Sequence, residues 1–226
     1  MKQHLMLAAD FTQRQQQTIA KAKYVSNPGC YATGAVLALK PLTANGLLKD
    51  EQQIAVHAVS GYTGGGRQMV EKYQQADEQN PTATLGLYGL DFNHKHTKEI
   101  FHWAGLNTRP VFIPSVANYA QGMLVQQAID LKQLQKPTTG KALHALYQDY
   151  YQGSNTVNVM PLNDKSSDNF APLLSPHGIE GSNLCQLYIY VDEDYQQALI
   201  VAKLDNLGKG ASGAAVQNLD LMLSGM

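Results

Sequence analysis

Two apolar runs near the end of the chain constrain its fold more than any other feature. Residues 184–191 (LCQLYIYV) and 198–204 (ALIVAKL) combine β-branched, aromatic and aliphatic side chains, and the acidic segment Asp192–Asp194 connects them. Such compositions favour extended strands. Together with comparable runs at 53–60, 84–90, 110–117 and 123–129, they predict one mixed sheet of about six strands.

Helical patterns lie between these runs, and we expect the helices to cover one face of the sheet. The predicted helices span residues 12–23, 30–45, 67–75, 96–106, 141–152 and 210–224. The stretch 61–66 (GYTGGG) is predicted to be a loop, because consecutive glycines disfavour regular elements. Residues 153–175, rich in Asn, Ser, Asp and Pro, are predicted to be the most mobile segment.

Composition excludes several classes of protein. Charged residues make up 15% of the chain and the net charge is −1, which argues against disorder driven by charge and against a basic nucleic-acid-binding surface. The apolar segment Leu5–Ala9 is too short for the core of a signal peptide. Because no apolar run approaches the ~20 residues of a membrane span, we expect a soluble cytoplasmic protein. Two cysteines cannot make a disulfide framework or a four-sulfur zinc site.

The segment Ser26–Thr33 (SNPGCYAT) carries the strongest chemical signal. A short strand enters a Pro-Gly turn, and Cys30 begins a helix. The free N–H groups and the positive dipole end of a helix stabilise a thiolate and the oxyanion that forms when it attacks a carbonyl. We therefore predict that Cys30 is a nucleophile with a lowered pKa, although a small residue packed at a helix start has the same pattern. Cys185, inside a predicted strand, is expected to be buried and inert.

A base for this thiol is offered by His94 and His96, which flank the start of a predicted helix. A neutral imidazole is the usual partner of a catalytic thiol. Zinc ligands and solvated surface histidines remain alternatives, and the sequence lacks matching ligands that would favour zinc. His57, alone among Val and Ala in a predicted strand, is expected to be a hydrogen-bonded core residue.

The segment Ser60–Arg67 (SGYTGGGR) follows one strand and opens a helix. It lacks the spacing of a dinucleotide-binding loop. Backbone N–H groups beside a guanidinium suit a phosphate or carboxylate, so an anion pocket containing Arg67 is predicted. A flexible hairpin tip is the alternative.

Taken together, these segments resemble N-acetyl-gamma-glutamyl-phosphate reductase, an enzyme family of arginine biosynthesis. The matching stretches are Ser26–Thr33, Ser60–Arg67, His94–Ile100, Phe112–Ser115, Asn118–Met123 and Asp205–Asn218, in the family's order. The resemblance implies an α/β (α+β) fold with a mixed, largely antiparallel sheet, like the catalytic domain of glyceraldehyde-3-phosphate dehydrogenase. It also implies a homo-oligomer, a dimer or tetramer, and no metal.

The family has an N-terminal Rossmann domain for NADP, and no such motif precedes Cys30 here. We therefore expect residues 1–207 to form the catalytic and oligomerisation domain. Residues 208–226 are expected to form the helix that packs on the NADP domain in the family. Without that domain, the last helix is expected to leave an uncovered apolar face containing Ala214, Ala215, Leu219 and Met222. NADPH binding by this chain alone is expected to be weak or absent.

The resemblance assigns roles to individual residues. Cys30 is implied as the nucleophile and His94 as the acid/base that faces it, with His57 as second choice. Substrate contacts are implied for Arg67, Ser60, Gly61, Gly64 and His96, and cofactor contacts for Asn206, Gly210 and Asn218. Gln121 stands where many members of the family carry arginine, which weakens one expected contact with the substrate carboxylate.

The implied reaction reduces N-acetyl-glutamyl 5-phosphate to the 5-semialdehyde. The thiolate displaces phosphate and forms a thioester. Hydride from NADPH then gives a hemithioacetal, which collapses to the aldehyde. Two alternatives remain open: a cysteine hydrolase or acyl transferase that needs no cofactor, and a non-catalytic domain that only oligomerises.

Overall fold

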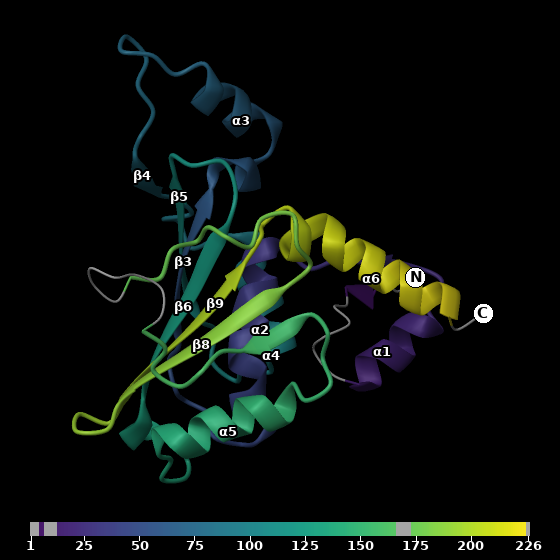
Figure 1. The fold of residues 1–226 in the computed structure, drawn as a ribbon, viewed down its shortest axis with the longest axis vertical. Coiled ribbons are helices and arrows are strands. Elements are labelled where there is room, and N and C mark those ends of the chain that lie inside the picture. Colours follow the sequence, from purple (N-terminus) through teal and green to yellow (C-terminus); the bar gives the residue numbers. More distant parts are fainter. Residues whose placement is uncertain (1–4, 7–12, 166–172, 225–226) are drawn as a thin grey trace.

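The computed structural model describes residues 5–6, 13–165 and 173–224 of the chain. Its centre is a seven-stranded sheet in the order β4-β5-β3-β6-β9-β8-β7 (Figure 1). The strands are β3 (Ala55–Gly61), β4 (Leu85–Leu87), β5 (Val111–Ala117), β6 (Met123–Asp130), β7 (Val157–Val159), β8 (Cys185–Asp192) and β9 (Gln197–Leu204). Four of the neighbouring pairs are antiparallel, and the pairs β3–β5 and β7–β8 are parallel. The predicted mixed, largely antiparallel sheet is thus confirmed.

Two short elements escaped the sequence prediction. Strand β7 has only three residues, and β1 (Leu5–Met6) pairs with β2 (Val25–Ser26) in a separate two-stranded sheet. Segments this short show no periodicity that could identify them. Strand β7 lies inside the predicted mobile segment 153–175, of which residues 166–172 fall outside the described part of the chain.

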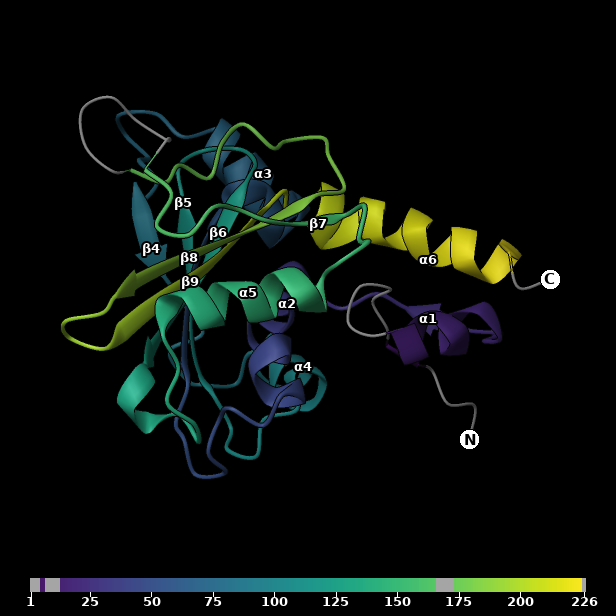
Figure 2. The same cartoon turned by 60° about the horizontal axis from the view of Figure 1, so that its bottom comes forward.

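Three helices gather on one face of the sheet (Figure 2). They are α2 (Cys30–Ala44), α4 (Lys95–Ala104) and α5 (Gly140–Tyr150). Helix α2 is central and buried almost all round, since eleven of its fifteen residues are buried. A helix that is apolar on every side needs cover from several elements, and α2 packs against α4, α5 and strands β6 and β9.

Pro41 lies inside α2 and removes one helical hydrogen bond. The carbonyl oxygen of Leu37, four residues earlier, instead accepts a hydrogen bond of 2.6 Å from the Tyr151 hydroxyl. The Tyr147 hydroxyl donates to the neighbouring carbonyl of Ala38. The Tyr151 hydroxyl, directly after α5, therefore satisfies the one carbonyl that the proline leaves without its helical donor, and Tyr147 adds a second contact between α5 and α2.

The opposite face of the sheet carries a smaller apolar cluster, formed by Leu124, Tyr188 and Val201 with Val59 packed against them. His57 lies two residues before Val59, so it points to this same face, and it is exposed. The expectation of a buried, hydrogen-bonded His57 was wrong. The Val and Ala residues on either side of His57 in the sequence did not indicate that its face of β3 is open to solvent.

The glycine-rich stretch after β3 also differs from expectation. Residues Tyr62–Gly65 form a 3-10 helix, η1, before α3 (Arg67–Gln74) begins. The sequence predicted an irregular loop there. A single tight turn tolerates glycines because it needs few backbone hydrogen bonds.

The chain ends in a π-helical turn, η3 (Gly208–Ser212), followed by α6 (Gly213–Ser224). Helix α6 extends away from the sheet beside α1 (Gln13–Ala20) (Figure 1). Ala214 is buried and Met222 packs against the α1 cluster, contrary to the expected uncovered face. Ala215 and Leu219 are exposed as predicted, and Val216 and Leu223 are exposed beside them. No helix in the described ranges has the length and apolar character needed to cross a membrane.

Candidate active site

Cys30 is the first residue of α2, as predicted, and Gly29 is the N-cap residue. The backbone N–H of Gly29 donates a hydrogen bond of 2.8 Å to the Glu99 carboxylate on α4. The Gly29 carbonyl accepts the first helical bond, from the N–H of Thr33, at 2.9 Å. The turn that presents the thiol is therefore held by a side chain 70 residues away.

His96 packs directly over this turn. A Cβ atom added to Gly29 would lie 1.7 Å from His96 Nε2, so only glycine leaves room for the ring. His96 is buried, with 6% of its surface exposed, and its Nδ1 atom has no hydrogen-bond partner. The imidazole adjacent to the start of α2 is thus His96.

His94 caps the start of α4. Its Nδ1 atom accepts a hydrogen bond of 3.2 Å from the His96 backbone N–H. Because Nδ1 acts as an acceptor, the proton of the neutral ring is assigned to Nε2. His94 also contacts the rings of Tyr31 and Phe112 edge to face. The two histidines therefore form one cluster, with ring centroids 4.6 Å apart.

The surroundings keep both imidazoles neutral. Burial, reinforced by His94 and Lys95, lowers the pKa of His96 to about 3. Burial and Lys95 also lower the pKa of His94, while Asp91 opposes the shift. A neutral imidazole is the form a thiol needs as its partner. Of the two rings, His96 keeps a nitrogen, Nδ1, without a hydrogen-bond partner, whereas Nδ1 of His94 accepts from the His96 N–H.

The predicted low pKa of Cys30 was wrong. Burial raises the pKa of its thiol to about 11, although the backbone N–H groups of Tyr31 and Cys30 and the charge of Lys95 act in the opposite direction. The helix terminus does favour the thiolate, as the sequence suggested, but desolvation outweighs it. Cys185 is fully buried, as expected.

Arg67 lies outside this cluster. Its side chain is 90% exposed and pairs with Glu71 one turn along α3, at 2.6 Å. Helix α3 projects beyond one end of the sheet (Figure 1). The structure does not bring the predicted anion-binding arginine together with Cys30.

The N–H groups of the glycine-rich stretch are also occupied. Those of Gly61, Tyr62 and Thr63 donate to the carbonyls of residues 122, 119 and 120. Ser60 is buried and its hydroxyl donates to the Gly61 carbonyl at 3.1 Å, while Gly64 is exposed. These residues build a turn, and the N–H groups of residues 61–63 and 66, which the predicted anion pocket could have used, are engaged in it.

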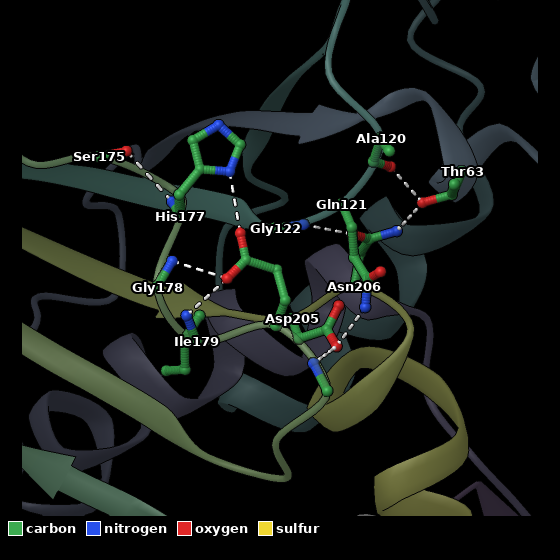
Figure 3. Close-up of polar contacts among 12 residues, drawn as sticks. Thr63, Ala120, Gln121, Gly122, Ser175, His177, Gly178, Ile179, Asp205 and Asn206 are labelled. Carbon is green, nitrogen blue, oxygen red and sulfur yellow. Dashed lines mark hydrogen bonds and ion pairs between the residues drawn. The ribbon is translucent and has the colours of Figure 1, made fainter. Parts of the chain in front are cut away.

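The three residues predicted to contact the cofactor are buried in the described chain. Asn206 accepts from the Gly122 N–H and donates to the Thr63 hydroxyl, each at 2.9 Å (Figure 3). Asn218 donates to the Asn27 side chain at 2.7 Å. Gly210 lies so close to Cys30 that an added Cβ would stand 2.6 Å from the Cys30 Cβ. They hold segments together and offer a cofactor no open surface.

Sequence reasoning missed Glu99 and Asp205. Glu99 lay within a quoted motif, but its partner is a backbone group that no pattern identifies. Asp205 is fully buried directly after β9 and accepts hydrogen bonds from Gln121, Gly181 and Leu207. Figure 3 shows its contact with Gln121. The residue that stands in place of the family's arginine, Gln121, therefore contacts Asp205. Among the described residues, no group of three His, Cys, Asp or Glu side chains is arranged to hold a metal ion.

The chain is similar to known proteins over most of its length. A family model of the semialdehyde dehydrogenase dimerisation domain matches residues 30–206. An N-acetyl-gamma-glutamyl-phosphate reductase from Burkholderia cenocepacia is 47% identical over 207 residues, which is 92% of this chain and 65% of that protein. The chain belongs to this reductase family. The resemblance inferred from its motifs is confirmed.

Other relatives show the same coverage. N-acetyl-gamma-glutamyl-phosphate reductase 2 from Nostoc sp. is 45% identical over 92% of this chain and 66% of its own length. The enzyme of the same name from Pseudomonas putida is 44% identical over 96% of the chain and 68% of its length. The chain thus spans about two thirds of the length of these reductases.

Solved structures support the fold. Aspartate semialdehyde dehydrogenase II from Vibrio cholerae superposes with a TM-score of 0.71 at 13% identity, covering 97% of this chain and 68% of that one. The enzyme from Francisella tularensis gives 0.69 at 14% identity, covering 96% and 70%. The reductase family therefore shares its fold with other semialdehyde dehydrogenases.

Proposed function

We propose that this chain carries the acyl-transfer half of an N-acetyl-gamma-glutamyl-phosphate reductase of arginine biosynthesis, with Cys30 as the nucleophile. The observation that carries the proposal is the placement of Cys30 at the start of α2. The preceding residue, Gly29, contacts the His96 imidazole and donates its N–H to the Glu99 carboxylate. The relatives are named for an acyl phosphate, which is an activated carbonyl with a good leaving group.

The proposed step is a substitution at the acyl carbon of the substrate. A base takes the thiol proton, and the sulfur attacks the acyl carbon of N-acetyl-glutamyl 5-phosphate. The bond from that carbon to the phosphate oxygen breaks, inorganic phosphate leaves, and a thioester remains on Cys30. Because burial raises the pKa of Cys30, the thiol is neutral at pH 7 and the attack requires a base.

His94 is the proposed acid/base group. It is half-buried, and to take the thiol proton its Nδ1 must release the hydrogen bond from the His96 N–H, because its Nε2 already carries a proton. His96 is buried, and burial lowers its pKa to about 3, which disfavours its protonated form. His96 then has a supporting role, filling the space over Gly29. The N–H groups at the start of α2 are suited to hold the oxyanion of the tetrahedral intermediate.

Reduction of the thioester needs a hydride donor, and the family resemblance implies that NADPH supplies the hydride when bound. The residues expected to hold it do not fit that task, because Asn206, Gly210 and Asn218 are buried and engaged within the chain. We therefore propose that the described part of the chain binds NADPH weakly or not at all and has no reductase activity by itself. The division between residues 1–207 and 208–226 is part of this proposal.

We also propose that the chain forms a homo-oligomer through the open face of its sheet, which is the face opposite α2. A cavity of about 320 Å³ there is lined by Leu124, Gln126, Leu174, Tyr190, Leu199 and Val201. The matching family model is described as a dimerisation domain. An apolar sheet face of this kind is suited to a second copy of the chain.

Phosphate release tests the proposed function. The full chain is mixed with N-acetyl-glutamyl 5-phosphate, without NADPH, and phosphate is followed together with the mass of the protein. We expect phosphate release with formation of an acyl adduct on Cys30, none with Cys30→Ser, and an unchanged result with Cys185→Ala. His94→Asn should slow the step by about 10²–10⁴-fold, and His102→Asn, on an exposed position of α4, is the matched control.

Two outcomes would contradict the proposal. Release that persists in Cys30→Ser would exclude the nucleophile. Rapid multiple turnover without NADPH would identify a hydrolase, the alternative that the sequence left open.

A further inference from the structure

Asp205 ties three segments together at the end of β9. Its Oδ2 atom accepts hydrogen bonds of 2.7 Å from the side chain of Gln121 and from the N–H of Gly181, and Oδ1 accepts one of 3.0 Å from the N–H of Leu207. Figure 3 shows the contact between Asp205 and Gln121. The side chain is fully buried, so its position is determined by these donors.

The backbone of Asp205 reaches toward the thiol. Its carbonyl oxygen accepts a hydrogen bond of 2.8 Å from the N–H of Gly210, inside the π-helical turn η3. A Cβ on Gly210 would stand 2.6 Å from the Cβ of Cys30 and 3.2 Å from the Asp205 carbonyl oxygen. The bare Cα of Gly210 therefore packs against Cys30 at a distance that no larger residue permits. Turns of π-helix are rare and frequently occur at functional sites.

We propose that Asp205 is a positioning residue for Cys30, acting through Gly210. The carboxylate fixes the start of η3 through Leu207, and the carbonyl fixes Gly210, so that η3 lies against the thiol and sets its orientation and its access to water. The proposal rests on the proposed function only in taking Cys30 as the reacting group.

The chemistry of the contacts requires a carboxylate. All three groups facing it are N–H donors, and an asparagine would turn an NH₂ group toward at least one of them. Displacement of η3 would admit water to the thiol. Because burial is the main cause of the raised pKa of Cys30, added water lowers that pKa and raises the thiolate fraction.

The test is the alkylation rate of each cysteine in the full chain, measured with iodoacetamide at pH 8 by peptide mapping. Gly210→Ala should raise the rate at Cys30 by about tenfold, the effect of one pKa unit on a thiolate. Asp205→Asn should act in the same direction by a few-fold, and Gln121→Ala, which removes one of three donors, should act least. The rate at Cys185 and the circular dichroism spectrum should stay unchanged.

A matched control is present at the start of α5. A Cβ on Gly140 would stand 2.9 Å from the Val191 side chain, a clash comparable to that at Gly210, with no atom of η3 or Cys30 among its nearest neighbours. Gly140→Ala should therefore leave the Cys30 rate within about twofold of the unaltered chain if the effect depends on the thiol contact. Gly86→Ala, with its nearest atom at 3.9 Å, controls for the substitution itself.

The proposal is overturned if Gly210→Ala and Gly140→Ala change the Cys30 rate equally, if Cys185 accelerates in parallel, or if Asp205→Asn and Gln121→Ala leave the rate at Cys30 unchanged. The pH profile of alkylation gives a second readout. Its midpoint should shift to lower pH for Gly210→Ala but not for the control glycine variant Gly140→Ala. Alkylation uses no substrate. If no phosphate is released while these alkylation rates change as expected, the proposed acyl-transfer function is wrong and the positioning role of Asp205 is supported.

Discussion

Gly29 offers the sharpest test of how the histidines and the thiol are arranged. Substitution by alanine places a Cβ 1.7 Å from Nε2 and 2.3 Å from Cδ2 of His96, so one of the two residues must move. His96 is buried between Tyr31 and Gly29, with its ring 5.8 Å from that of Tyr31. Overpacking at such a site costs about 1–3 kcal/mol. The free energy of unfolding should fall by that amount, measured by urea denaturation monitored by circular dichroism.

A double-mutant cycle separates this clash from other effects of the substitution. His96→Ala removes the ring, and in that background Gly29→Ala should cost less than about 0.5 kcal/mol, so the two changes are strongly non-additive. Gly86→Ala, whose Cβ meets only Ala83 at 3.9 Å, is the control and should couple to His96→Ala by less than that amount. Additive costs for Gly29 and His96 would refute the placement of the imidazole over the start of α2.

The other predictions concern stability and pH. Tyr151→Phe should lower the free energy of unfolding by about 1–3 kcal/mol, because it leaves the buried Leu37 carbonyl without a donor. His96 has a depressed pKa, so its contribution to stability is complete above pH 6.5 and is lost as the pH falls toward 3; His96→Asn should flatten the unfolding free energy over that window. The hydrogen bond from its own N–H, helped by His177 and neighbouring N–H groups, lowers the pKa of Glu180 to about 2 from its usual 4.5. Stability from Glu180 should therefore be lost between pH 4.5 and 2, and a pH titration of Glu180→Gln should lack that part of the loss.

The sheet could be predicted from the sequence because its long strands are apolar enough to be recognised as strands. The runs at 184–191 and 198–204 became β8 and β9, which pair along their whole length. The same reasoning failed for His57, since alternation along β3 shows that two faces differ but does not show which face is open. Short segments such as β7 contain too few residues to show the alternation of apolar and polar side chains that identifies a strand.

The candidate site was predictable in part. The Pro-Gly-Cys turn correctly placed Cys30 at the start of a helix, because a turn followed by an apolar stripe is a local signal. The pKa of the thiol could not be predicted, since it depends on how deeply the surrounding elements bury the sulfur. The prediction that Arg67 belongs to the site was wrong for a related reason. Its position after three glycines fixed its place in the chain, but the direction of α3 takes the side chain into solvent.

The proposed function depends on formation of an acyl-enzyme at Cys30 from an acyl phosphate. Mass spectrometry of the full chain after mixing with N-acetyl-glutamyl 5-phosphate, without NADPH, detects this intermediate. We expect one N-acetyl-glutamyl group attached to the peptide containing Cys30, removable by hydroxylamine, together with an equal amount of phosphate. An adduct on Cys185, or phosphate release by Cys30→Ser at the rate of the unaltered chain, would contradict it.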